Sequence, residues 1–166
     1  MILFGDRVVC STDDLVRAAR CEFALLRALD TELGLVLSPD ATDPVQFPLG
    51  SDERNAKTND SALAVYAVFP HTYWSVKSVK YIWSAVVPVG THLTSSAGLT
   101  QVRVLRSGAQ GKGGWVEERV NVLEDYRKYF ETTEAPKPAG IAVLTDADDT
   151  GSSAQGDYAS FRACKP

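Results

Sequence analysis

The stretch Leu63-Ala-Val-Tyr-Ala-Val-Phe69 opens the part of the chain in which the hydrophobic period changes from helical to strand-like. Its β-branched and aromatic residues are typical of a β-strand. The same pattern predicts further strands at 78–84, 100–107, 115–123, 140–145 and 158–164, separated by loops that contain Gly, Ser or Pro. Six short strands at these intervals predict a mainly β fold, an antiparallel, jelly-roll-like β-sandwich that is either complete or lacks strands. One short helix is expected at 124–130.

Upstream of these strands, residues 12–33 carry the one long helical pattern. Asp13 and Asp14 suit the first turn of a helix, and Gly34 suits its end. An apolar stripe recurs at three- and four-residue steps, through Leu15, Ala19, Phe23, Leu26, Leu29 and Leu33. Residues 37–59 are polar and rich in turn formers. We therefore predict an N-terminal amphipathic helical segment at 1–36, a linker at 37–59 and a β-sandwich domain at 60–166.

The composition of the chain limits which partners and which cellular location we expect. The 166 residues are 45% hydrophobic and 23% charged, with a formal net charge of −4. An acidic balance argues against nucleic acid or an anionic membrane as partner. The start of the chain is unlike a signal peptide, and no apolar run approaches the roughly 18 residues that span a bilayer, so we expect a cytoplasmic protein. Cys10, Cys21 and Cys164 lack the spacing of a metal or redox motif and are expected to be free thiols. The oligomeric state stays open.

An acidic loop, Asp146-Ala-Asp-Asp-Thr-Gly-Ser-Ser-Ala-Gln-Gly-Asp157, is the strongest candidate for a cofactor site. Calcium loops place oxygen ligands at positions 1, 3, 5, 7 and 12, with Gly at 6. The residues at those positions are Asp146, Asp148, Thr150, Ser152 and Asp157. Thr at position 5, Asp at position 12 and the flanking strands depart from the pattern. The alternatives are no cofactor, with a solvated loop stabilised by turn hydrogen bonds, or a polar-ligand site that includes Asp149.

The stretch 100–123 is predicted to be a hairpin with its turn near Lys112. This register sets Val102 opposite Val122, Val104 opposite Val120, and Arg106 opposite Glu118, all on one face. The charged pair is either a structural ion pair or a polar group that lines a ligand groove.

Trp74 begins a stretch, residues 74–83, in which aromatic residues alternate with Lys77 and Lys80. Such a stretch is either a strand with its aromatic residues in the core or a surface on which sugar rings or nucleic-acid bases stack. The acidic balance of the chain disfavours bases, so a sugar ring is the expected ligand of Trp74 if the stretch forms such a surface rather than part of the core.

Two resemblances add to this reading. Residues from about 50 to 164, through Asn59-Asp-Ser-Ala-Leu, Gly114-Trp-Val-Glu-Glu-Arg and Ile141-Ala-Val-Leu-Thr-Asp, resemble the C-terminal part of a bacterial, mostly exported family of unknown function. That resemblance implies a jelly-roll-like fold of the carbohydrate-binding type. Residues 1–36, through Val8-Val-Cys-Ser-Thr-Asp-Asp-Leu, resemble the N-terminal segment of actinobacterial RecB-like nuclease candidates. The E-x-K pair that would hold Mg²⁺ in such a nuclease is missing from the chain.

Three functions remain open from the sequence. The first is a non-catalytic module that binds a polar, carbohydrate-like small molecule. The second is a glycoside hydrolase that uses Glu118 or an acid of the 146–157 loop as general acid, which would need a second carboxyl group across a cleft. The third is a structural or accidental fusion without a ligand.

Overall fold

The computed structural model describes residues 2–4, 7–9 and 45–164. The chain divides into two compact units, one made of Met1–Thr42 with Tyr158–Pro166 and the other of Asp43–Asp157. In the first unit, β1 (Ile2–Phe4) and β2 (Arg7–Val9) pair antiparallel. The predicted helix at 12–33, Cys10 and Cys21 lie outside the described residues.

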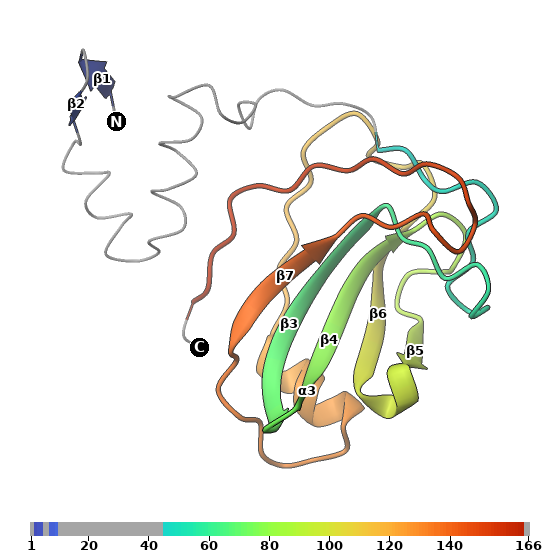
Figure 1. The fold of residues 1–166 in the computed structure, drawn as a ribbon, viewed down its shortest axis with the longest axis vertical. Coiled ribbons are helices and arrows are strands. Elements are labelled where there is room, and N and C mark those ends of the chain that lie inside the picture. The colour runs from blue at the N-terminus through green and yellow to red at the C-terminus, as the bar shows by residue number, and fades with distance from the viewer. Residues whose placement is uncertain (1, 5–6, 10–44, 165–166) are drawn as a thin grey trace. The chain divides into compact units, whose positions relative to one another are not determined.

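The second unit is built on a five-stranded sheet with the order β5-β6-β4-β3-β7 (Figure 1). The strands are β3 (Leu63–Thr72), β4 (Ser75–Ser84), β5 (His92–Ser95), β6 (Thr100–Ser107) and β7 (Gly140–Leu144). A short 3₁₀ helix, η1 (Ser96–Gly98), joins β5 to β6. The mainly β fold is confirmed, but the sheet is mixed, because β4 and β6 run parallel while the other neighbours are antiparallel.

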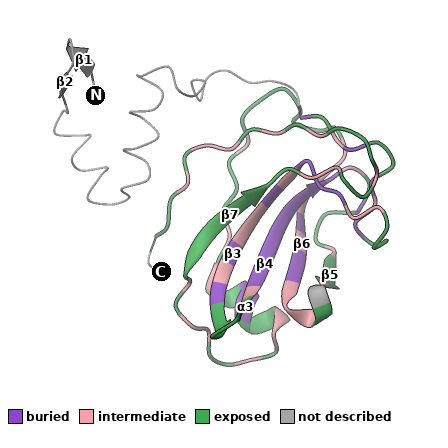
Figure 2. Cartoon of the chain, viewed as in Figure 1, coloured by how far each residue is buried: buried purple, intermediate pink, exposed green. Residues whose placement is uncertain are grey.

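The two faces of this sheet carry different apolar clusters. One face carries Ala64, Ile82, Val102 and Val104. Val87, from a loop, packs in the same cluster. The opposite face carries Ala67, Phe69, Val79 and Tyr81, and the helix α3 (Val122–Tyr129) supplies Tyr126. Within the described part of Asp43–Asp157, a helix rather than a second sheet covers this face, so a sandwich is not confirmed. Figure 2 shows the buried residues in β3, β4 and β6, whereas β7 is exposed along its length.

Helix α3 confirms the short helix expected at 124–130, and its sequence explains both of its ends. The side chain of Asn121 accepts a hydrogen bond from the backbone N–H of Glu124 and so caps the first turn. Acidic residues occupy the first turn, and Arg127 and Lys128 occupy the last, which suits the helix dipole at both ends. The ring of Tyr126 lies 4.4 Å from that of Phe69, measured between centroids, and this contact seats the helix on the sheet.

The predicted strand at 115–123 is wrong, and the reason is the topology of the sheet. Residues 115–121 form no strand, and α3 begins at Val122. Strand β6 already has β4 on one edge and β5 on the other, so no edge is left for a hairpin partner. Val102 therefore lies beside Lys80 and Leu93 rather than opposite Val122.

Two further expectations for the strands differ from the structure. Residues 158–164 contain no strand, and the pattern missed the short strand β5. Residues 45–59, expected to belong to a linker, fall within the Asp43–Asp157 unit, where Val45 is buried against Ala62 and Trp83. No helix among the described residues has the length and apolar character needed to cross a membrane.

Candidate functional site

Three aspartates converge where β3 begins and β7 ends. Asp60 precedes β3, whereas Asp146 and Asp148 follow β7. Because β3 and β7 are antiparallel neighbours, the start of one lies beside the end of the other, and the N–H of Asp146 donates to the carbonyl of Ser61 at 3.0 Å. One carboxylate oxygen from each of the three aspartates lies within 4.8 Å of the other two. We call this group, Asp60, Asp146 and Asp148, the aspartate cluster.

Asp60 shapes the loop that carries the other two aspartates. Its side chain is fully buried, and its two oxygens accept the backbone N–H groups of Asp149 at 3.2 Å and Thr150 at 2.8 Å. The turn ends at Gly151, whose φ of 60° is the left-handed conformation that glycine adopts without strain. The carboxylate of Asp60 therefore holds the 148–151 turn against the end of the sheet.

Lys80 places a buried positive charge in the middle of the sheet, on β4. It lies opposite Tyr66 and beside Val102, so its side chain belongs to the face that carries the Val102–Val104 cluster. Only 6% of Lys80 is exposed, and its Nζ lies 5.6 Å from the centroid of the Tyr66 ring. Burial lowers the pKa of Lys80, and the negative charges of Asp146, Glu53 and Asp60 oppose this shift.

The charges of the cluster act strongly on one another. Burial raises the pKa of Asp146, and the hydrogen bond and the negative charge of neighbouring Asp148 raise it further. Carboxylates so close together repel, and the repulsion is relieved by a shared proton or by a cation. Both the uptake of a proton and the binding of a hard cation are thus within the chemistry of this arrangement.

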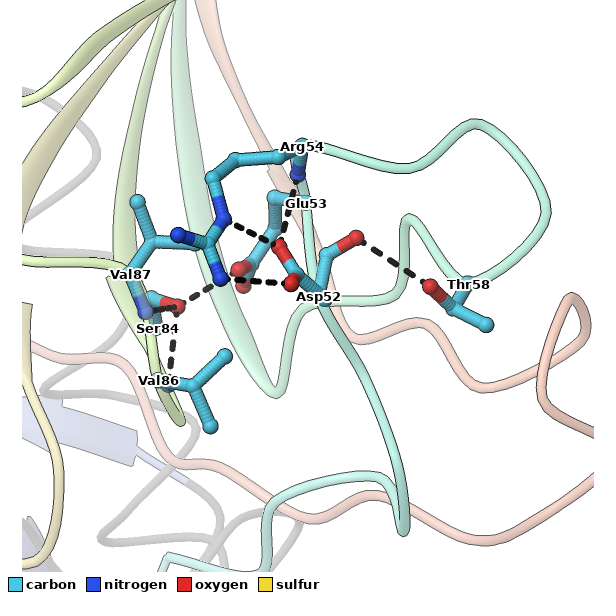
Figure 3. A network of polar contacts seen from close by, with 7 residues as sticks. All are labelled: Asp52, Glu53, Arg54, Thr58, Ser84, Val86 and Val87. Carbon is cyan, nitrogen blue, oxygen red and sulfur yellow. Dashed lines mark hydrogen bonds and ion pairs between the residues drawn. The ribbon is translucent and has the colours of Figure 1, made fainter.

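A second buried carboxylate, Glu53, attaches the 50–60 loop to the same end of the sheet (Figure 3). Its oxygens accept hydrogen bonds from Ser84 Oγ at 2.5 Å and from Ser61 Oγ at 3.4 Å. Ser84 Oγ in turn accepts the backbone N–H groups of Val86 and Val87. On the exposed side of the loop, hydrogen bonds from Arg54 lower the pKa of Asp52 to about 2. Glu53 is therefore a structural anchor that lies beside the aspartate cluster.

The other predicted ligands of the 146–157 loop have different partners. The hydroxyls of Thr150 and Ser152 lie 2.8 Å apart in a hydrogen bond, and Ser152 Oγ also accepts the N–H of Leu49 at 3.0 Å. Asp157 is exposed and, in the described part of the chain, is not a member of the aspartate cluster. Asp149 contributes its backbone N–H to Asp60.

Sequence reasoning missed Asp60 and considered Lys80 only as part of the aromatic stretch 74–83, although both leave a trace in the sequence. Asp60 lies shortly before the apolar strand β3, and Lys80 lies within the buried part of β4. A charged residue in a buried strand is uncommon unless it is paired, so Lys80 was the stronger signal.

The predicted ion pair between Arg106 and Glu118 is present, although Glu118 lies in a loop and not in a strand. Arg106 Nε donates to Glu118 Oε1 at 2.5 Å, and both side chains are partly exposed. The guanidinium carbon also lies 5.7 Å from the centroid of the Trp83 ring. The carboxylate of Glu118 is thus paired with a cation, and both alternatives, a structural pair and a group that lines a ligand groove, stay predictions.

Trp74 lies at the tip of the β3–β4 hairpin and is 90% exposed. Its ring meets that of Tyr73, itself exposed, edge to face at a centroid distance of 4.6 Å. The two rings border an open hollow of about 490 Å³ whose other walls are Pro70, Thr72, Ser75, Val76 and Ala139. The core alternative for Trp74 is therefore wrong, since its ring is on the surface.

A protein-family model matches most of the chain. The match covers residues 46–162, and the family is described as "Protein of unknown function (DUF3047)". No curated protein matches the chain, and no solved structure does.

Proposed function

We propose a function for this chain, which belongs to the DUF3047 family of proteins of unknown function: it is a non-catalytic module that binds a polar, carbohydrate-like ligand. The observation that carries the proposal is the exposed pair of rings, Tyr73 and Trp74, beside the hollow at the hairpin tip. Large aromatic side chains are costly to leave in water, and neighbouring exposed ones mark a binding surface more often than isolated ones do.

The chemistry of this surface suits a sugar. An indole ring offers a rigid apolar face with little conformational entropy to lose, and the C–H face of a sugar ring is complementary to it. Hydroxyl groups stand beside the rings, because Thr72 Oγ1 and Ser75 Oγ lie 2.6 Å apart in a hydrogen bond at the hairpin turn. A ligand with both C–H faces and hydroxyl groups would use both parts of the surface.

One of the two resemblances supports the proposal, and only at the level of the family. Residues from about 50 to 164 resemble a bacterial, mostly exported, jelly-roll-like family, which favours a sugar-binding surface. The resemblance of residues 1–36 to RecB-like nuclease candidates contributes nothing to the proposal.

The test compares two tryptophans in the full chain. A glycan array identifies a ligand, and titration calorimetry then measures its affinity for the unsubstituted protein, Trp74→Ala and Trp115→Ala. Trp115 is the matched control, because it is 44% exposed and does not line the hollow. We expect Trp74→Ala to weaken binding by about tenfold or more, about 1.4 kcal/mol, and Trp115→Ala to leave it unchanged. An array without any binding, or equal effects of both substitutions, would show that this surface is not the site.

A further inference from the structure

Strand β7 forms one edge of the five-stranded sheet, and β5 forms the other. In the described part of the chain, the one strand that pairs with β7 is β3. Alternate residues of a strand turn their N–H and C=O groups to opposite sides, so an edge strand offers donors and acceptors to which a further strand can pair. The composition of the two edges differs: β5 is His-Leu-Thr-Ser, whereas β7 is Gly-Ile-Ala-Val-Leu.

The features that normally protect a sheet edge are missing from β7. Proteins block an edge strand with charged residues, a proline or a bulge. The five residues of β7 include no charge and no proline, and their register with β3 has no shift. The side chains of Ile141 and Val143 are 53% and 47% exposed. This edge is therefore suited to the addition of another strand.

Ile141 and Val143 lie on the same face of the sheet. Ile141 is opposite Ala67 and Val143 is opposite Val65, so both belong to the face on which α3 packs. A strand added beside β7 would extend the sheet under this face. Side chains directly opposite each other on the two strands would then meet, and pairs of β-branched side chains stabilise such a ladder.

We propose that β7 pairs antiparallel with β7 of a second copy of this chain, in the register that sets Ala142 opposite itself. Two identical antiparallel strands can exchange hydrogen bonds only when a residue lies opposite itself, because neighbouring residues point their backbone groups to opposite sides. Of these registers, the one centred on Ala142 pairs all five residues of β7. Ile141 of each copy then faces the partner's Val143, so the β-branched contact is made twice.

The charges that flank β7 complement one another in this register. Lys137 precedes the strand, and Asp146 and Asp148 follow it. The register sets residue 137 of one copy opposite residue 147 of the other, so Lys137 comes between the partner's Asp146 and Asp148. Lys137 is exposed and makes no ion pair with another described residue. The same charge pair forms at both ends of the ladder, which favours a second copy of the chain as the occupant of this edge.

The oligomeric state of the full chain tests the proposal. Sedimentation velocity, without any sugar present, follows the unsubstituted protein from about 1 µM to about 1 mM. A strand of five residues is about 17 Å long, so the contact is smaller than a standard interface and the dimer should dissociate on dilution. A two-fold contact closes on itself, so we expect monomer and dimer and no larger species.

Val143→Lys is the discriminating variant, and Val86→Lys is its matched control. Val86 is 53% exposed and lies in the loop after β4, outside the proposed contact. A lysine on an edge strand opposes strand addition, so Val143→Lys should raise the dissociation constant of the dimer at least about tenfold and Val86→Lys less than about twofold. Circular dichroism checks that both variants are folded.

Lys137→Glu tests the register from an exposed position outside the strand, where folding does not depend on the side chain. Two attractive contacts become repulsive, so the dimer should weaken about fivefold, and Asp148→Lys in the same chain should restore much of the loss.

Three results would overturn the proposal: a monomer over the whole range, oligomers that keep growing with concentration, or equal effects of Val143→Lys and Val86→Lys. A dimer that Lys137→Glu leaves unchanged would overturn the register centred on Ala142. Because no sugar is present, none of these results depends on the Tyr73–Trp74 surface.

Discussion

Glu53 illustrates how a single buried carboxylate couples a loop to a sheet. Hydrogen bonds from Ser84 and Ser61 satisfy its oxygens, yet burial still raises the pKa of Glu53. The hydrogen bond from Ser84 and the charge of Lys80 act in the opposite direction and do not cancel the effect of burial. The side chain is therefore held where its neutral form is easier to accommodate than its charged form.

This has a consequence for the pH dependence of stability. Because the folded pKa of Glu53 lies above its ordinary value of 4.5, the folded state binds more protons than the unfolded state just above pH 4.5. The contribution of Glu53 to stability is therefore present at lower pH and lost as pH rises through the folded pKa. We expect Glu53→Gln to flatten this fall in the free energy of unfolding, measured by urea denaturation from about pH 4 to about pH 7. Glu117→Gln, at an exposed position, should keep it; an unchanged slope in Glu53→Gln would contradict the assignment.

Among the elements, α3 is attached to the sheet by one carboxylate as well as by apolar contacts. Asp125 accepts two hydrogen bonds from Arg103 Nη1, at 2.9 and 3.0 Å, and one from the Tyr81 hydroxyl at 2.9 Å. Tyr81 is buried, and burial together with the charge of Asp125 raises its pKa. The arrangement joins the helix to β4 and β6 at once.

Removal of this carboxylate should loosen the helix. Asp125→Ala leaves the buried Tyr81 hydroxyl without its acceptor, a loss that costs about 1–3 kcal/mol, while Arg103, partly exposed, can turn to water. Tyr81→Phe removes one hydrogen bond and should cost about 1 kcal/mol. Chemical denaturation of both variants and of the double variant measures the coupling. We expect Tyr81→Phe to cost nothing further once Asp125 is gone; additive losses would show that the two groups do not interact.

At the scale of the whole molecule, the Asp43–Asp157 unit contains its own apolar clusters on both faces of the sheet. Its edge strand β7 exposes Ile141, Val143 and Leu144, which is unusual for a sheet edge because exposed apolar edges promote aggregation. Whether the unit is stable by itself therefore depends on whether the burial of its apolar clusters outweighs the tendency of this exposed edge to aggregate.

We expect a chain shortened to residues 43–157 to fold, because the described apolar clusters are made of residues within this range. Circular dichroism should show mainly β structure, and thermal unfolding should be a single cooperative transition at low protein concentration. The full-length chain measured alongside is the reference. Aggregation of the shortened chain, or the absence of a transition, would show that residues outside 43–157 are needed to cover the sheet.

Local pattern was enough to predict several elements of this protein. The alternation of apolar residues located β3, β4, β6 and β7 to within a few residues, and the short helix expected at 124–130 corresponds to α3. The exposure of Trp74 was harder to predict, because a tryptophan in an aromatic, strand-like stretch can lie either in the core or at the tip of a hairpin. Only the β3–β4 turn at Tyr73 and Trp74 decides in favour of the surface.

Strand partners and the aspartate cluster were decided by tertiary structure alone. A period of two specifies which face a side chain occupies but not which strand lies beside it, since backbone hydrogen bonds are the same for every sequence. The sequence therefore predicted the Arg106–Glu118 ion pair correctly but from a wrong strand pairing. The predicted hairpin does not form, because β5 occupies the edge of β6 that the hairpin would need. For the same reason Asp60 meets Asp146 across 86 positions of sequence, the difference between their residue numbers, only because β7 returns antiparallel beside β3.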